Sequence, residues 1–217
     1  MHILRPFSPL VNRLVKLYTR HDRKFSFKDI NVKVKRGVFH PGLFMSTKIM
    51  LNYVEGLNLK QKTFLELGSG TGVISILAAK KDALVYASDI STTAVENTRF
   101  NASENEVEID VIKSDLFEKI PNVQFDYIII NPPYYTKDPE TDEQFAWYCG
   151  KDHEYFKKLF NSLPDFINQK SIVIMILSEV CDIITIKSIG EEKGFNWNLI
   201  QSKTAWGEKN YIFRLTM

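Results

Sequence analysis

The chain has 217 residues, 44% of them hydrophobic and 25% charged, which is typical of one large globular domain or of a domain with an arm. No apolar run reaches the ~18 residues of a membrane span, and the N-terminus lacks the uninterrupted apolar core of a signal peptide, so we expect a cytoplasmic protein. Two distant cysteines without a CxxC pair indicate reduced thiols, and four histidines without ligand spacing argue against a zinc or iron enzyme.

The formal net charge of +2 is unevenly distributed along the chain. Residues 1–60 contain 12 Lys or Arg and 3 Asp or Glu, whereas residues 61–217 contain 16 and 23. A basic piece joined to an acidic body is typical of proteins with an anionic partner such as nucleic acid, but a solubilising surface has the same composition. Charge alone therefore leaves the kind of partner open.

The N-terminal residues predict a short extension. Ser8-Pro9 is typical of a helix start, with Ser at the N-cap and Pro in the first turn, and the apolar residues that follow recur at helical spacing. Residues 29–35 alternate apolar and polar side chains, which predicts a half-exposed strand. We therefore expect residues 1–40 to form a basic extension with a helix and a short strand.

The remaining residues, 41–217, have the pattern of one α/β domain. The predicted strands are 62–67, 84–90, 108–116, 125–130 and 171–178. The predicted helices are 46–56, 73–81, 91–105, about 152–168 and about 179–193. Strands that alternate with helices indicate a largely parallel sheet. Two further β-rich runs, 195–206 and 211–217, are joined by a tight turn and predict an antiparallel hairpin that closes the sheet.

A glycine-rich loop, FLELGSGTG at 64–72, separates a predicted strand from a predicted helix. Glycines there let the backbone turn sharply and approach a ligand closely. A dinucleotide fingerprint GxGxxG starting at Gly68 would need glycine where Val73 stands, and no GK[ST] follows, so neither that fingerprint nor a P-loop is present. The GxGxG spacing instead suits a ligand that lies over the loop. The predicted loop contacts are Gly68, Ser69, Gly70, Thr71 and Gly72.

Acidic side chains stand at the carboxyl ends of three successive predicted strands, the edge where open α/β sheets bind ligands. Asp89 is placed to accept hydrogen bonds from both hydroxyls of a ribose. Glu66 is placed to face an ammonium group directly or through water, and Asp115 to accept from an adenine amino group. Each acid alone is more typical of a surface residue or a helix cap, but three beside a glycine loop predict a nucleoside site. Their neighbours Ile90, Ser114 and Leu116 complete the predicted site.

Four motifs together carry a family resemblance: LELGSGTG (65–72), SDI (88–90), SDLF (114–117) and NPPY (131–134). In this order and spacing the sequence resembles class I S-adenosylmethionine-dependent methyltransferases, and more narrowly the N-methyltransferases with an NPPY motif. The run SDLFEKI followed by FDYIIINPPYY is similar to HemK-type glutamine methyltransferases. The resemblance implies a Rossmann-like, doubly wound, mostly parallel seven-stranded sheet and S-adenosyl-L-methionine as the cofactor. It also places Phe39, Pro41 and Thr47 near the ligand.

The NPPY motif follows a predicted strand, and its four residues are the predicted catalytic group. A planar amide or amino nitrogen is a poor nucleophile because its lone pair is delocalised. The Asn131 side-chain oxygen and the Pro132 carbonyl are placed to accept its two N–H groups and aim the lone pair at a methyl group, which also brings Asn131 against the cofactor. Pro132 and Pro133 hold Asn131 extended, and Tyr134 offers a flat face to a planar substrate. The simpler alternative is a rigid strand exit.

Two classes of methyl acceptor remain open: a protein glutamine, as in a release factor, and an amino group of an RNA or DNA base. The net charge of −3 in TKDPETDEQ, residues 136–144, would repel a phosphate backbone, whereas the basic extension favours structured RNA. The extension is also shorter than the helical N-terminal domain of bacterial HemK proteins. A third alternative is a methyltransferase-like subunit that binds without catalysis. We expect neither a membrane nor a metal to take part, and the sequence is compatible with a monomer.

Overall fold

The structure is a computed structural model that describes residue 18, residues 20–205 and residues 207–217. The helix predicted to begin at Ser8 lies outside this part of the chain. The elements in chain order are β1 (Arg23–Phe27), β2 (Ile30–Val34), α2 (Met45–Glu55), β3 (Thr63–Leu67), α3 (Val73–Ala79), β4 (Leu84–Asp89), α4 (Thr92–Glu104), β5 (Asp110–Lys113), β6 (Tyr127–Ile130), η1 (Asp142–Ala146), α5 (Glu154–Ser162), η2 (Leu163–Phe166), β7 (Ile172–Ser178), α6 (Ile183–Glu191), β8 (Asn196–Ala205) and β9 (Glu208–Thr216), where η denotes a 3-10 helix.

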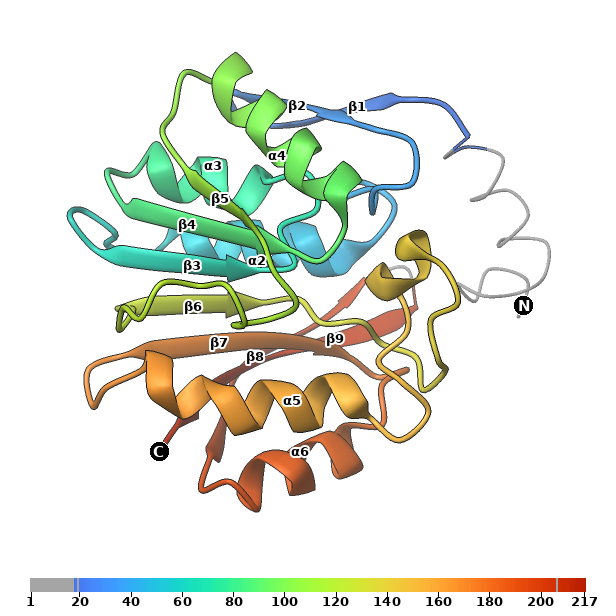
Figure 1. Cartoon of the computed structure of the whole chain (residues 1–217), viewed down its shortest axis with the longest axis vertical. Helices are drawn as coiled ribbons and strands as arrows, with labels where there is room; N and C mark the ends of the chain where they lie inside the picture. Colours follow the sequence, from blue (N-terminus) through green and yellow to red (C-terminus); the bar gives the residue numbers. More distant parts are fainter. Residues whose placement is uncertain (1–17, 19, 206) are drawn as a thin grey trace.

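Seven strands form the central sheet in the order β5-β4-β3-β6-β7-β9-β8 (Figure 1). The strand β3 pairs in parallel with β4 and β6, and β5 and β7 extend the parallel part on either side. The strand β9 runs antiparallel between β7 and β8, so the C-terminal hairpin forms one edge of the sheet. The prediction of a doubly wound, mostly parallel seven-stranded sheet with a terminal antiparallel hairpin is confirmed.

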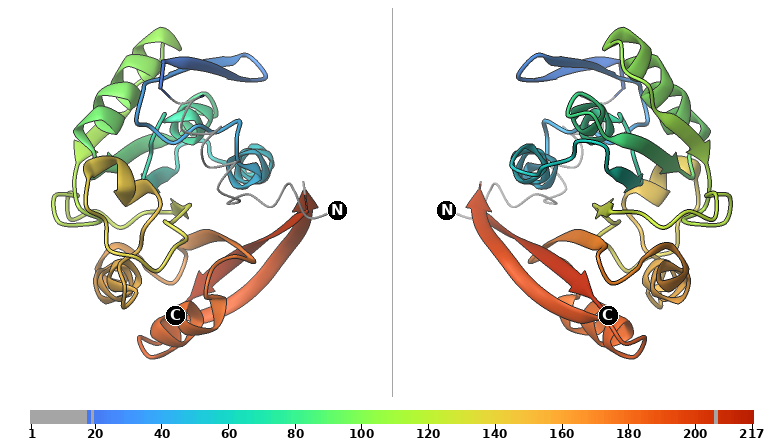
Figure 2. Two further views of the ribbon diagram at one scale, coloured as in Figure 1. Left: turned by 90° about the vertical axis from the view of Figure 1, so that its right-hand side faces the viewer. Right: turned by 90° about the vertical axis from the view of Figure 1, so that its left-hand side faces the viewer.

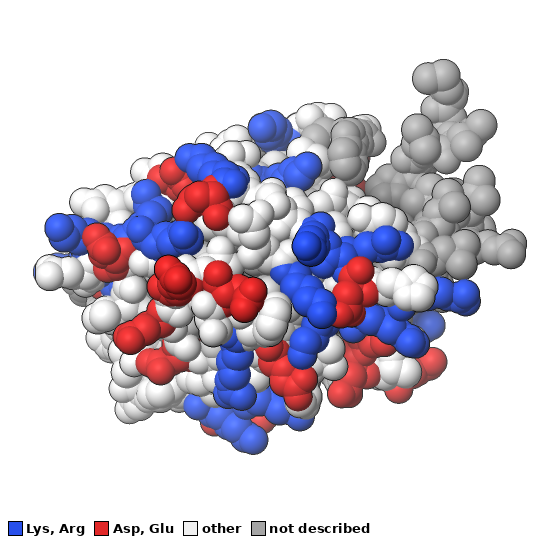
Figure 3. Space-filling view, turned by 90° about the horizontal axis from the view of Figure 1, so that it is seen from above, with Lys and Arg blue, Asp and Glu red and all other residues white. Residues whose placement is uncertain are grey.

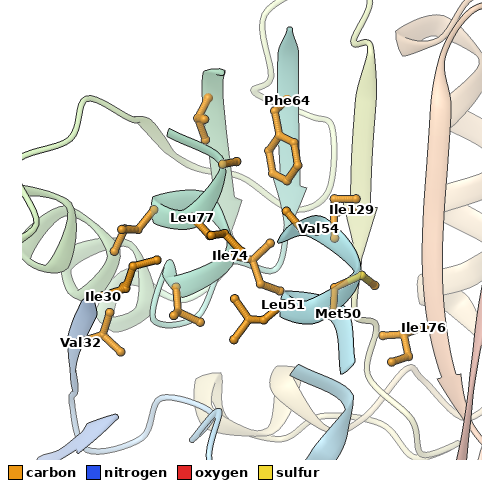
Figure 4. Close-up of a cluster of buried hydrophobic side chains, with 14 of the residues drawn as sticks. Ile30, Val32, Met50, Leu51, Val54, Phe64, Ile74, Leu77, Ile129 and Ile176 are labelled. Atoms are coloured by element: carbon orange, nitrogen blue, oxygen red, sulfur yellow. The ribbon is translucent and has the colours of Figure 1, made fainter. Parts of the chain in front are cut away.

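Helices cover both faces of the sheet (Figure 2), and successive strand residues alternate between the two sides. Phe64 and Ile129 belong to the core that contains α2 and α3 (Figure 4). Leu65 and Ile128 belong to the core that contains α5 and α6. All four side chains are fully buried. Burial on both faces explains why these strands read as continuous apolar runs rather than as alternating ones.

Helix boundaries follow from local chemistry. The hydroxyl of Ser91 accepts a hydrogen bond from the Ala94 main-chain nitrogen, so α4 begins where the sequence predicted. The helix predicted over about 152–168 ends as an α-helix at Ser162 and continues as a 3-10 turn that contains Pro164, because proline has no N–H to donate within a helix. The helix predicted near 179 begins later, after Asp182, which caps it.

A separate two-stranded antiparallel ribbon, β1–β2, lies beside α4 (Figure 1). The sequence predicted β2 but not its partner β1. Ile30, Val32 and Val34 are buried with residues of α2 and α3, while the residues between them are exposed, as the alternation predicted. The chain leaves the ribbon directly into residues 37–47, several of which line the candidate site described below. The packing of the ribbon therefore positions that segment.

Candidate active site

A cavity of about 450 Å³ lies at the carboxyl ends of β3, β4, β5 and β6. This is the edge at which open α/β sheets bind ligands. With the exception of Gly72, every residue predicted for cofactor binding or catalysis lines it. Phe39, Pro41 and Thr47, which the family resemblance placed near the ligand, line it as well. Residues that the sequence separates by more than a hundred positions therefore share one cavity.

Gly72 is the one predicted loop residue that does not line the cavity, and its contact with a ligand stays a prediction. It is the N-cap residue of α3, with a φ of 75°, and a Cβ atom there would lie 2.6 Å from Cγ2 of Thr98 in α4. Glycine is required at this position by backbone conformation and packing. Gly68 has a similar φ of 76°, but no atom of another part of the chain lies within 4 Å of the place a Cβ would take. The space over Gly68 therefore remains open to a ligand.

Asp89 is held between the glycine loop and the start of α4. Its Oδ2 accepts a hydrogen bond from the Gly70 main-chain nitrogen at 2.9 Å, and its Oδ1 accepts from the Ser91 nitrogen at 2.9 Å. Burial raises the pKa of this carboxyl group, although the main-chain donors oppose the shift. Each oxygen has a further lone pair. The carboxylate is thus oriented to accept from neighbouring hydroxyl groups, as a ribose would present them.

Glu66 lies beneath the glycine loop and is buried. Its Oε2 accepts hydrogen bonds from the Ser75 main-chain nitrogen at 2.9 Å and from the Ser75 hydroxyl. Burial raises the pKa of Glu66 to about 8, and the nearby Asp89 acts in the same direction. A carboxyl group whose pKa is raised by burial is stabilised in its charged form by a cation. Glu66 lines the cavity, and its role toward an ammonium group stays a prediction.

Asp115 lies at the rim of the cavity in an ion pair that the sequence did not reveal. Lys158 in α5 places its Nζ 2.5 Å from Asp115 Oδ2 and 2.5 Å from Glu118 Oε1. Asp115 therefore has one oxygen engaged by an ammonium group. Asp115, the predicted acceptor for an adenine amino group, lies at the cavity, but it also forms an ion pair with Lys158 of α5.

Asn131 is the centre of a small polar network. The Tyr134 hydroxyl donates a hydrogen bond to Asn131 Oδ1 at 2.9 Å, and Asn131 Nδ2 donates to the Ser46 hydroxyl oxygen at 3.4 Å. Burial raises the pKa of Tyr134 well above its usual value, so the phenol stays protonated. Sequence reasoning missed Ser46, although the family resemblance pointed to its neighbour Thr47. The network shows that the NPPY segment is tied to the first turn of α2.

Three aromatic rings form one wall of the cavity. The ring centroids are 4.8 Å apart for Phe39 and Phe44, 5.1 Å for Phe39 and Trp147, and 5.0 Å for Phe44 and Trp147. Trp147 belongs to a segment that folds back on the NPPY motif, since its carbonyl accepts from the Tyr135 nitrogen at 2.9 Å. The acidic segment 136–144 thus forms a loop beside the cavity, and the hydrogen bond between Tyr135 and Trp147 joins the two ends of this loop.

The described part of the chain contains neither a metal-binding cluster nor a membrane-spanning helix. No group of three or more His, Cys, Asp or Glu side chains in it is placed to hold a metal ion. None of its helices has both the length and the apolar character needed to cross a membrane.

Comparison with known proteins gives a consistent result. Residues 29–148 match the family described as methyltransferase small domain. The chain is 34% identical over 148 residues to the protein N5-glutamine methyltransferase MJ0928 of Methanocaldococcus jannaschii, covering 65% of this chain and 75% of that protein. It is 36% identical over 157 residues to the release factor glutamine methyltransferase of Dictyoglomus turgidum, covering 64% of this chain and 55% of that protein.

The fold is also found in solved structures. A ribosomal protein L11 methylase from Lactobacillus delbrueckii subsp. bulgaricus superposes with a TM-score of 0.64 and 21% sequence identity. The superposition covers 90% of this chain and 91% of that one. At this identity the likeness concerns the fold alone.

Proposed function

The chain belongs to the methyltransferase small domain family and is an S-adenosyl-L-methionine-dependent methyltransferase. We propose that it methylates the side-chain amide nitrogen of a glutamine residue in a protein. Two relatives are named for glutamine methylation, and the chain spans three quarters of one and about half of the other. The observation that carries the proposal is the Asn131 amide at the cavity, beside the glycine loop and Asp89.

The residues of the cavity suit the cofactor. The open space over Gly68 leaves room for a nucleoside above the loop, and Asp89 is oriented to accept from its ribose. Glu66, with its raised pKa, would hold the ammonium group of the methionine part. The bound cofactor supplies an activated methyl group on a sulfonium. The protein's own task is then to position the acceptor nitrogen.

Positioning falls to the NPPY segment. We propose that Asn131 Oδ1 and the Pro132 carbonyl accept the two N–H groups of the glutamine amide and turn its lone pair toward the methyl group. These hydrogen bonds strengthen as positive charge develops on the nitrogen, which is the differential binding that catalysis requires. Pro132 and Pro133 are buried and fix the backbone around them. Tyr134 contributes the neighbouring ring.

Charges at the cavity favour a polypeptide over a nucleic acid. Among the described residues that line the cavity, Lys158 is the sole lysine or arginine, and it is paired with Asp115 and Glu118. Further acids line the cavity outside the cofactor-binding set: Asp138, Asp142, Glu154 and Glu208. A phosphate backbone entering this cavity would meet like charge. A peptide segment would not.

The basic ribbon does not present a uniform positive surface either. Lys28, Lys33 and Lys35 each form an ion pair, with Glu55, Asp22 and Glu96 respectively. Figure 3 shows lysine and arginine interspersed with aspartate and glutamate on the face that carries the ribbon. Nucleic-acid-binding surfaces instead gather cations on one face. The described part of the extension thus gives little support to an RNA substrate.

The proposal is tested by methyl transfer from tritiated cofactor into a fractionated lysate. We expect label in protein, recovered as methylated glutamine after digestion and mass spectrometry. Label confined to RNA would overturn the proposal of a protein substrate but would still show methyltransferase activity. If RNA is labelled, binding should also weaken steeply with salt, because counterion release governs phosphate contacts.

The variant Asn131→Ala tests the catalytic role. It should lower turnover by about 10²-fold or more while cofactor affinity, measured by calorimetry, changes by less than about twofold. Asn198→Ala serves as the matched control, because Asn198 is an exposed asparagine of β8 that does not line the cavity. Full activity in Asn131→Ala would rule out the proposed mechanism.

A further inference from the structure

We propose that Ser46 is a positioning residue for methyl transfer, which holds the amide plane of Asn131 in the orientation that the acceptor nitrogen needs. The inference rests on the proposed function of Asn131. Ser46 lies 85 positions before Asn131 in the sequence and outside the NPPY motif, and its hydroxyl oxygen accepts from Asn131 Nδ2.

The geometry gives Ser46 little freedom. Its side chain is 2% exposed and stands in the first turn of α2. The next turns of that helix are anchored in the core by Met50, Leu51 and Val54, each with no exposed surface (Figure 4). The Ser46 hydroxyl is therefore presented to the cavity from a rigid element. A polar group on such an element holds its partner more precisely than one on a loop.

Two hydrogen bonds connect the three polar groups. Asn131 Nδ2 donates to the Ser46 oxygen, and the Tyr134 hydroxyl donates to Asn131 Oδ1. Asn131 is thus held at both ends of its amide group, and rotation about its last side-chain bond would break two contacts. Oδ1 keeps a second lone pair for an N–H of the substrate.

The Ser46 contact is long, at 3.4 Å between nitrogen and oxygen. Hydrogen bonds of a catalytic group often shorten when the reacting complex forms. Ser46 also belongs to residues 37–47, which line the same cavity as the glycine loop.

The kinetic test compares Ser46→Ala, Ser46→Thr and the control Ser171→Ala. Ser46→Ala should lower kcat by about 10- to 100-fold, the usual cost of a small misplacement, with cofactor affinity within about twofold of the parent. Ser46→Thr keeps the hydroxyl and should restore most of kcat. Ser171 is also buried and donates to the Phe125 carbonyl, but it stands before β7 and does not line the cavity. Its alanine variant should lower stability without lowering kcat.

A second measurement is independent of the substrate. The side-chain NH₂ signals of Asn131, assigned by their loss in Asn131→Asp, should shift in the ¹⁵N–¹H spectrum of Ser46→Ala and return in Ser46→Thr. Unchanged signals in Ser46→Ala, or an unchanged kcat, would overturn the role of Ser46. If the parent protein methylates no glutamine, the proposed function fails, whereas the NMR comparison still decides whether Ser46 holds Asn131.

Discussion

Glu66 Oε2 accepts a hydrogen bond from the Ser75 main-chain nitrogen at 2.9 Å, so a carboxyl group from β3 caps the first turn of α3. The N-cap position of that helix is Gly72, which has no side chain to do so. Ser75 carries one of the N–H groups that a helix leaves without an internal partner. One buried acid therefore satisfies the helix start and faces the cavity. If Glu66 holds the cofactor's ammonium group as proposed, its protonation state affects both stability and cofactor binding.

Cofactor affinity should rise as the pH approaches about 8 from below. Below its pKa of about 8, Glu66 is protonated and neutral in the free protein. A cationic ligand must then drive off this proton, which costs affinity, whereas nearer pH 8 more of the carboxylate is already charged. The ligand's own α-amino group has a pKa of about 8, so the rise ends there. Calorimetry at several pH values measures the effect and the release of the proton. The variant Glu66→Gln should bind more weakly and lose this pH dependence, whereas an equally steep profile in the variant would contradict the assignment.

Stability of the free protein should fall as the pH rises from about 4.5 to about 8. The pKa of Glu66 is raised from an ordinary value of 4.5 to about 8, so between these values the folded state holds a proton that the unfolded chain has released. Its contribution is complete below pH 4.5 and is lost as the pH rises through about 8. Urea unfolding at about pH 6 and pH 9 measures the difference.

The pKa of Asp89 is also raised, so part of the slope should remain in Glu66→Gln. The variant should nevertheless show a clearly smaller loss of unfolding free energy between the two pH values. A slope identical to that of the parent would show that Glu66 ionises normally.

The buried Asn101 should matter more to stability than its half-buried neighbour Asn105. Asn101 accepts from the Lys33 nitrogen and donates to the carbonyls of Lys33 and Thr71, so it joins α4 to β2 and to the glycine loop. Asn101→Ala removes the partner of the Lys33 nitrogen and of the Thr71 carbonyl, whereas Asn97 still donates to the Lys33 carbonyl, and should cost about 2–4 kcal/mol of unfolding free energy. Asn105→Ala removes similar contacts to Asn31 where water can replace them, and should cost about 1 kcal/mol or less. Equal losses in the two variants would contradict this account.

Gly72 and Gly68 should respond differently to alanine. Both have a positive φ, so both substitutions carry about 1–2 kcal/mol of backbone strain. At Gly72 the new Cβ would also collide with Thr98, so Gly72→Ala should lower stability further. At Gly68 the Cβ would enter open space over the loop, so Gly68→Ala should chiefly weaken cofactor binding. Thermal unfolding and calorimetry on both variants separate the two effects.

Much of the fold and of the candidate site could be read from local sequence. The alternation of strand and helix patterns predicted the sheet, because the period of apolar residues reports directly on which faces are buried. The glycine loop, Asp89 and Asn131 were predicted to meet because parallel strands place their carboxyl ends at one edge. These predictions need information from only a few neighbouring residues and one rule of topology.

Other features were decided by contacts between distant residues. The ribbon β1–β2 is held by Asn97, Asn101 and Asn105, whose side chains bond to the free edge of β2. Their spacing of four residues in α4 matches the two-residue spacing in the strand, because one turn of helix and two residues of strand have nearly the same length. The spacing of the three asparagines was visible in the sequence, but the strand that they bind was not.

Contacts between distant residues also decided several features of the candidate active site. Local sequence patterns were enough to predict that a glycine loop, acids at strand ends and an NPPY segment would share one edge of an α/β sheet. The contact of Ser46 with Asn131, the ion pair of Lys158 with Asp115 and the packing of Gly72 against Thr98 became visible only in the folded chain. Local patterns record which face of an element is buried, whereas these pairings depend on how separate elements are set against one another when the core closes.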